Sequence, residues 1–134
     1  MFSAFKTNGE DFFAGDYLNN YDGFLTNYGN SFNLTSGIFT SPREGVFEFS
    51  AATYHWTQGS YKLIVEKNNI QVLQFRAYAE SEYGNSDTLS FSWIMELNQG
   101  ETVRLRVGNS GKFDAYGNAN WVFSGKYIRD SMIQ

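Results

Sequence analysis

The strictest pattern in the chain is an alternation of apolar and mostly polar side chains over residues 88–97. The apolar set consists of Leu89, Phe91, Trp93, Met95 and Leu97. A period of two places these side chains on one face of a β-strand and their neighbours on the other. No stretch of the sequence has a convincing helical period, so the chain is predicted to be all-β.

The rest of the sequence divides into further short strands separated by turn residues. The expected strands are residues 2–7, 23–28, 31–34, 36–40, 46–56, 61–67, 70–78, 102–107 and 121–128. Asn68 and Asn69 are expected to form a hairpin turn, since Asn tolerates left-handed backbone angles. Residues 8–22, 79–87 and 108–120 are predicted to be long polar loops. Eight to ten short strands indicate a sandwich or a jelly roll.

Residues 36–49 contain the only proline of the chain, together with two glycines and three phenylalanines. Gly37 and Gly45 can adopt backbone angles closed to other residues, and Pro42 fixes its own φ. Phe47 and Phe49 then fall on one face of the following strand. The segment is predicted to be a strand, a corner and a second strand.

The composition narrows the classes of fold and function that are expected for this chain. The 134 residues are expected to form one domain, covering residues 1–134, and the aromatic content of 19% favours strands. A net charge of −4 with only ten Lys and Arg argues against nucleic-acid binding. No apolar run is long enough to span a bilayer, so no membrane insertion is expected, and the absence of cysteine excludes thiol chemistry.

Several spaced motifs resemble the globular C1q domain of the C1q and tumour-necrosis-factor-like superfamily. The matching residues are Phe2-Ser3-Ala4, Asn27, Gly29, Phe32-Asn33, then Gly37, Phe39, Pro42, Gly45, Phe47 and Phe49, and later Leu97, Gly100, Val103, Phe123 and Gly125. Phe47, Glu101 and Lys126 depart from the usual residues of the family, and Lys126 could alter a subunit contact.

The resemblance implies a ten-stranded jelly-roll β-sandwich that assembles as a homotrimer, is secreted and is not an enzyme. It implies a recognition module that binds carbohydrate or protein ligands, with lectin-like pattern recognition in innate immunity as the leading role. Two alternatives remain open, an adhesive extracellular matrix trimer and a cytokine-like receptor ligand. No collagen repeat is present, so a head-only protein or an excised head is expected.

Family members often bind calcium through the loop before the long alternating strand, which here is residues 79–87. Glu80 and Asp87 stand at typical ligand positions, and Glu82 and Asn85 could add oxygens. Calcium takes six to eight oxygen ligands, so backbone carbonyls and water would complete the site. The alternative is that acidic loop residues are simply solvated.

Further candidate residues could contact a bound ligand. Tyr83 and Tyr116 lie in predicted loops and could stack on sugar rings, and Arg76, Arg104 and Arg106 could contact anionic groups such as carboxylated sugars. Asn33 begins an Asn-Leu-Thr glycosylation sequon.

Catalysis is not expected. His55 is the only histidine, so it has no second histidine or cysteine with which to form a nucleophile–base pair.

Overall fold

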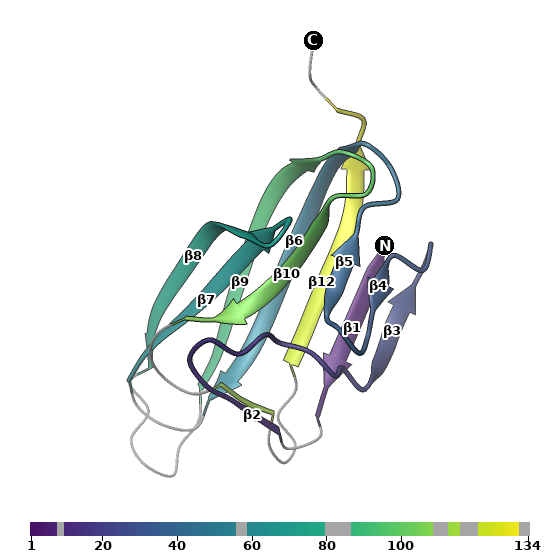
Figure 1. Cartoon of the computed structure of the whole chain (residues 1–134). Coiled ribbons are helices and arrows are strands. Elements are labelled where there is room, and N and C mark those ends of the chain that lie inside the picture. The colour runs from purple at the N-terminus through teal and green to yellow at the C-terminus, as the bar shows by residue number, and fades with distance from the viewer. Residues whose placement is uncertain (8–9, 56–58, 80–86, 109–112, 116–120, 132–134) are drawn as a thin grey trace.

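The computed structural model describes residues 1–7, 10–55, 59–79, 87–108, 113–115 and 121–131, and describes the backbone alone at 10–12, 54–55, 59–61, 77–79, 87–89 and 113–115. Within this part of the chain, two five-stranded antiparallel sheets make up the body of the molecule (Figure 1). The prediction of an all-β fold with ten main strands is confirmed.

Sheet I contains both the first and the last long strands of the chain. Its order is β3 (Gly23–Asn27), β1 (Phe2–Lys6), β12 (Trp121–Arg129), β6 (Gly45–His55) and β9 (Asp87–Leu97). Sheet II has the order β4 (Phe32–Asn33), β5 (Ile38–Thr40), β10 (Thr102–Val107), β7 (Gly59–Lys67) and β8 (Ile70–Ala79). Neighbours in both sheets are often far apart in sequence, as crossing connections between two sheets require.

A third, two-stranded sheet corrects the sequence prediction of long loops at residues 8–22 and 108–120. Strand β2 (Glu10–Phe12) pairs antiparallel with β11 (Phe113–Ala115), with Asp114 opposite Asp11. Both segments are only three residues long, which is too short to show a readable alternation. They pair because the fold brings two distant loops together.

The core between the sheets is built from phenylalanine rings. The ring of Phe2 stacks on that of Phe32 with centroids 4.4 Å apart, and the ring of Phe49 lies 5.2 Å from Phe39 and 6.1 Å from Phe123. All five side chains are buried. Because side chains alternate along each strand, every second residue can point into the core, and the apolar faces of the two sheets pack against each other.

The predicted strand–corner–strand at residues 36–49 is confirmed, but its two glycines serve different purposes. Gly37 has a φ of +73°, and an added Cβ would lie 2.1 Å from the carbonyl oxygen of Leu18. Gly45 does not have a positive φ. A Cβ there would instead lie 2.5 Å from the ring of Tyr127, so close packing requires the glycine.

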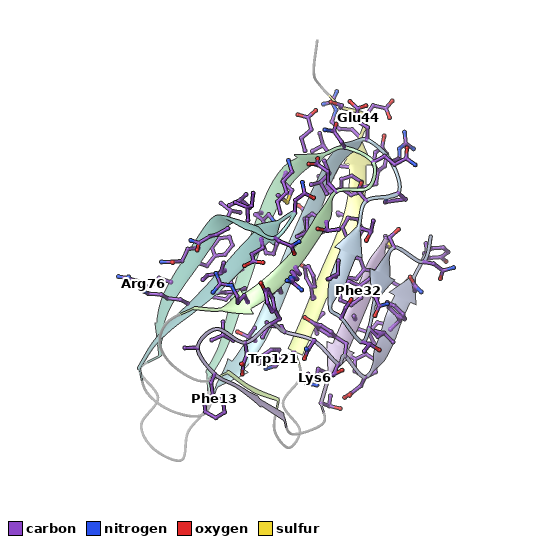
Figure 2. The ribbon with its side chains drawn as sticks, in the orientation of Figure 1. Lys6, Phe13, Phe32, Glu44, Arg76 and Trp121 are labelled. Carbon is purple, nitrogen blue, oxygen red and sulfur yellow. The ribbon has the colours of Figure 1, made fainter. Side chains whose placement is uncertain are left out.

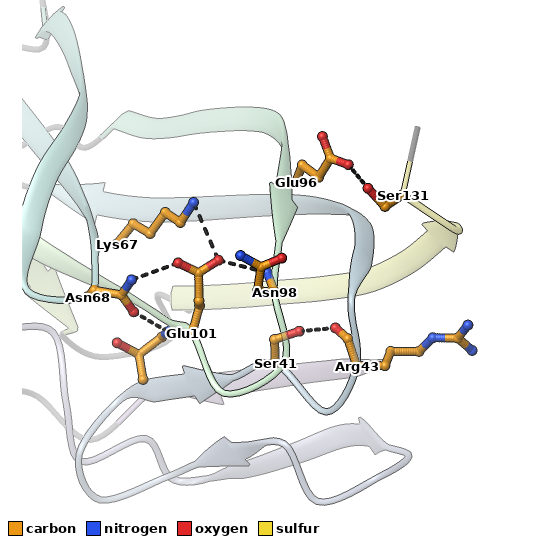
Figure 3. Close-up of polar contacts among 9 residues, drawn as sticks. Ser41, Arg43, Lys67, Asn68, Glu96, Asn98, Glu101 and Ser131 are labelled. Atoms are coloured by element: carbon orange, nitrogen blue, oxygen red, sulfur yellow. Dashed lines mark hydrogen bonds and ion pairs between the residues drawn. The ribbon is translucent and has the colours of Figure 1, made fainter. Parts of the chain in front are cut away.

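Two turns hold one end of the sandwich together through Glu101 (Figure 3). Its carboxylate accepts hydrogen bonds from the backbone N–H of Asn98 at 2.7 Å and from Asn68 Nδ2 at 2.8 Å. Asn68 and Asn69 have φ angles of 53° and 67°, so the predicted hairpin turn is confirmed. The Asn98 N–H, then the Asn68 amide and the Lys67 charge, hold the pKa of the Glu101 carboxyl below its usual range.

Candidate ligand-binding surfaces

The candidate calcium ligands lie almost entirely outside the described residues. Glu80, Glu82 and Asn85 are not described, and Asp87 is the first residue of β9, with only its backbone placed opposite His55. In the described residues, no group of three or more His, Cys, Asp and Glu side chains could hold a metal ion. The calcium site therefore stays a prediction.

The aromatic candidates have different positions. Tyr83 and Tyr116 lie outside the described residues. Trp121 begins β12 with its side chain 1% exposed, so it belongs to the core.

The three arginine candidates lie on strands of sheet II rather than on loops. Arg76 is exposed on the edge strand β8, and its side chain extends away from the body of the molecule (Figure 2). Arg104 and Arg106 are two residues apart on β10, where Val103, Leu105 and Val107 alternate with them and are buried. Both arginines therefore face away from the core.

Arg104 and Arg106 share one buried carboxylate. Glu66 on β7 is 4% exposed, its Oε2 accepts a hydrogen bond from Arg106 Nε at 2.8 Å, and its Oε1 lies 3.6 Å from Arg104 Nε. Tyr17 donates its hydroxyl to the same carboxylate at 3.0 Å. Sequence reasoning missed Glu66 and Tyr17. The only available signal was that Glu66 is the single acidic residue on the outward face of β7.

Asn33, the first residue of the sequon, is exposed in β4. Its Oδ1 accepts hydrogen bonds from the backbone N–H groups of Thr35 at 2.9 Å and Ser36 at 3.0 Å. These bonds use the side-chain oxygen and orient the amide. Glycosylation at this position stays a prediction.

The outer face of sheet I carries a row of small hydroxyl side chains. Cross-strand pairing places Thr26 beside Ser3, Ser3 beside Ser124, Ser124 beside Ser50 and Ser50 beside Ser92. The Ser124 hydroxyl donates to Ser3 Oγ at 2.8 Å. The row crosses all five strands, so small uncharged side chains occupy the middle of this face.

Charged and larger residues lie beside that row. Lys126 Nζ is 3.3 Å from Glu48 Oε1 across β12 and β6, and Ile94 on β9 is 61% exposed. A shallow hollow of about 270 Å³ lies between Ser50, Ser124 and Lys126. Lys126, which departs from the family pattern, therefore forms an ion pair with Glu48 on the same face.

A cluster of polar side chains lies at the C-terminal end of β12. Arg43 Nη2 donates to Asp130 Oδ1 at 2.8 Å, and its guanidinium carbon lies 4.2 Å from the centre of the Tyr127 ring. Tyr127 also donates its hydroxyl to Asp130, and this hydrogen bond raises the pKa of the phenol. The group joins the corner at residues 41–44 to the end of β12.

The described residues contain no helix with the length and apolar character to cross a bilayer.

Two mammalian proteins match part of this chain in sequence. The chain is 34% identical over 86 residues to Complement C1q tumor necrosis factor-related protein 3 of Mus musculus and, to the same extent, of Homo sapiens. The match covers 63% of this chain and 34% of each relative, so the chain spans only about a third of their length.

A solved structure described as the globular domain of zebrafish complement 1qA protein superposes with a TM-score of 0.76, covering 97% of this chain and 98% of that chain. Its sequence identity is 17%, so this likeness shows the fold alone and confirms the jelly roll. The model of the C1q domain matches residues 1–128. Because this match covers nearly the whole chain, the chain belongs to the C1q domain family.

Proposed function

We propose that this chain is a secreted, non-enzymatic recognition module that forms a homotrimer and binds carbohydrate or protein ligands. The observation that carries the proposal is the row of small hydroxyl side chains across sheet I, from Thr26 to Ser92. Small side chains let the backbone of a partner approach closely, and their short reach leaves little side-chain entropy to lose on association. Sheet I is therefore proposed as the surface between subunits.

The opposite face of the sandwich has a different character. The outward residues of sheet II include Arg104 and Arg106, whose charges would be costly to bury in a subunit interface without complete pairing. In a trimer joined through sheet I, this face and the loops remain open to solvent. Ligand recognition is accordingly assigned to them, with lectin-like pattern recognition in innate immunity as the leading role.

The assembly is tested by light scattering at micromolar concentration on the wild type and on two arginine variants. Ser50→Arg places a long charged side chain in the middle of the hydroxyl row, and Gln74→Arg adds the same charge to the exposed outer face of sheet II. We expect a trimer for the wild type and for Gln74→Arg, and dissociation for Ser50→Arg. A wild-type monomer, or a Ser50→Arg trimer with unchanged stability, would refute the proposed interface.

The ligand class is tested by a glycan array with and without calcium. Binding that needs calcium would support the predicted site at Glu80, Glu82, Asn85 and Asp87, with calcium as a cofactor. Binding without calcium would leave recognition to other side chains. A blank array under both conditions would remove the lectin-like role and favour the cytokine-like role, which the name of the mammalian relatives also suggests.

A further inference from the structure

The outer face of sheet II contains a cationic cluster whose geometry is fixed before any ligand arrives. Glu66 lies opposite Arg104 in the register between β7 and β10, accepts a hydrogen bond from Arg106 Nε and forms an ion pair with Arg104 Nε at 3.6 Å. Each guanidinium has five N–H donors, and one carboxylate can occupy only a few of these ten. The side chains of Arg104 and Arg106 keep 22% and 26% of their surface exposed, so unused donors can reach solvent.

Tyr17 fixes the cluster from the other side. The segment that carries it pairs with the part of β10 that β5 does not reach, where Leu18 N–H donates to the Leu105 carbonyl at 3.0 Å and Val107 N–H donates to the Asp16 carbonyl at 2.8 Å. The guanidinium carbon of Arg104 lies 3.5 Å from the centre of the Tyr17 ring. A stacked guanidinium with a hydrogen-bonded neighbour loses little freedom when it binds an anion.

Two more cations extend the cluster across the sheet. Lys62 on β7 lies directly opposite Arg76 on β8, and residues directly opposite each other share a face. Gly108 follows β10 and has no side chain, and a Cβ there would lie 2.3 Å from Lys62 Cβ, so the lysine stem occupies this space. Lys62 and Arg76 are like charges side by side, an arrangement that is unfavourable until an anion lies between them.

The four cations follow a diagonal line. Arg104 and Arg106 follow each other on the outward face of β10, Lys62 is the diagonal neighbour of Arg106 on β7, and Arg76 lies opposite Lys62 on β8. With ordinary strand spacing and rise, the line is about 15 Å long. In the described residues, Glu66 is the only carboxylate that forms a salt bridge with any of the four, so they outnumber it by three charges in a chain of net charge −4.

We propose that this line of cations is the binding site for an acidic polysaccharide, a linear glycan with repeated carboxylate or sulfate groups. A single small anion could contact only the two arginines beside Glu66, whereas a chain with repeated charges would contact the whole line. Fixed guanidinium groups suit the planar geometry of carboxylates and the oxygens of sulfate. The inference rests on the proposed recognition function and names its ligand class.

The test measures binding to heparin, polygalacturonate and neutral dextran at low and moderate salt. One variant is the double substitution Lys62→Gln and Arg76→Gln, and its matched control is Arg43→Gln with Arg129→Gln, which removes the same charge from exposed positions at the other end of the strands. Arg76, Arg43 and Arg129 are exposed and Lys62 is half-buried, so both proteins should fold.

We expect the wild type to bind both acidic glycans and not dextran, with affinity that falls as salt rises. The Lys62/Arg76 variant should bind about tenfold more weakly with a shallower salt dependence, and the control should change by less than about threefold. Equal weakening of both variants would show attraction by overall charge and would overturn the site. A wild type that binds acidic glycans no better than dextran would overturn it as well.

These outcomes are distinguishable from failure of the proposed function. A trimer that binds neutral glycans or a protein, but neither acidic probe, overturns only the acidic-polysaccharide site. A monomer that still binds heparin in a Lys62- and Arg76-dependent way overturns the trimer and retains the site.

Discussion

Replacement of Phe49 by alanine should be among the most destabilising single changes in the core. The side chain is 0% exposed, and its ring lies between 5.2 and 6.3 Å from the rings of Phe39, Phe47, Trp93 and Phe123. Truncation of a buried phenylalanine to alanine costs about 3–5 kcal/mol, the transfer term plus the cavity that remains. Since natural domains are stable by only about 5–15 kcal/mol, this loss is a large part of the total.

The measurement is thermal and urea unfolding at one fixed protein concentration, because assembly makes the stability of an oligomer depend on concentration. For a chain of this size, the expected decrease in the melting temperature is about 10–20 °C. Phe13→Ala is the matched control, since the same side chain is removed from a position that is 56% exposed. Its expected effect on the free energy of unfolding is within about 0.5 kcal/mol.

The comparison between the two variants decides the outcome. If Phe49→Ala and Phe13→Ala differ by less than about 1 kcal/mol, the ring of Phe49 does not hold the two sheets together, and the account of the core is wrong. An unchanged urea m-value with a lower midpoint would place the loss in the native packing rather than in the unfolded chain.

Three further predictions concern the corner, the turn carboxylate and the metal. Gly37→Ala should lower the free energy of unfolding by about 2 kcal/mol or more, since it adds a clash to a positive φ. Gly100→Ala, with a positive φ in open space, should lower it by only about 1 kcal/mol. Equal losses in thermal unfolding would contradict the role of the clash. The folded-state pKa of Glu101 is depressed, so the stabilisation by its carboxylate is present above the unfolded-state pKa and is lost as pH falls through the folded-state pKa. The melting temperatures of the wild type and Glu101→Gln should therefore converge on acidification. A difference in melting temperature that does not depend on pH would refute this. If Glu80 and Asp87 bind calcium, calcium at a hundredfold its dissociation constant should stabilise the wild type by about 2.7 kcal/mol relative to chelator, and identical melting curves would exclude the site.

The sequence by itself determined the ten main strands and the inner faces of the two large sheets. Alternation along residues 88–97 was sufficient to predict β9, because the burial of Trp93 and Leu97 follows from local periodicity alone. Asn68 and Asn69 were readable for the same reason, since a tight turn depends on the backbone preferences of its own residues.

The tertiary structure decided what no local pattern specifies. The pairing of β2 with β11, the packing that requires Gly45 and the meeting of Tyr17, Glu66 and Arg106 all join residues far apart in the chain. Alternation predicted that the arginines face outward, but only the register between β7 and β10 places them on a shared carboxylate. Register depends on the whole sheet, and therefore the line of cations could be recognised only after the strands were placed side by side.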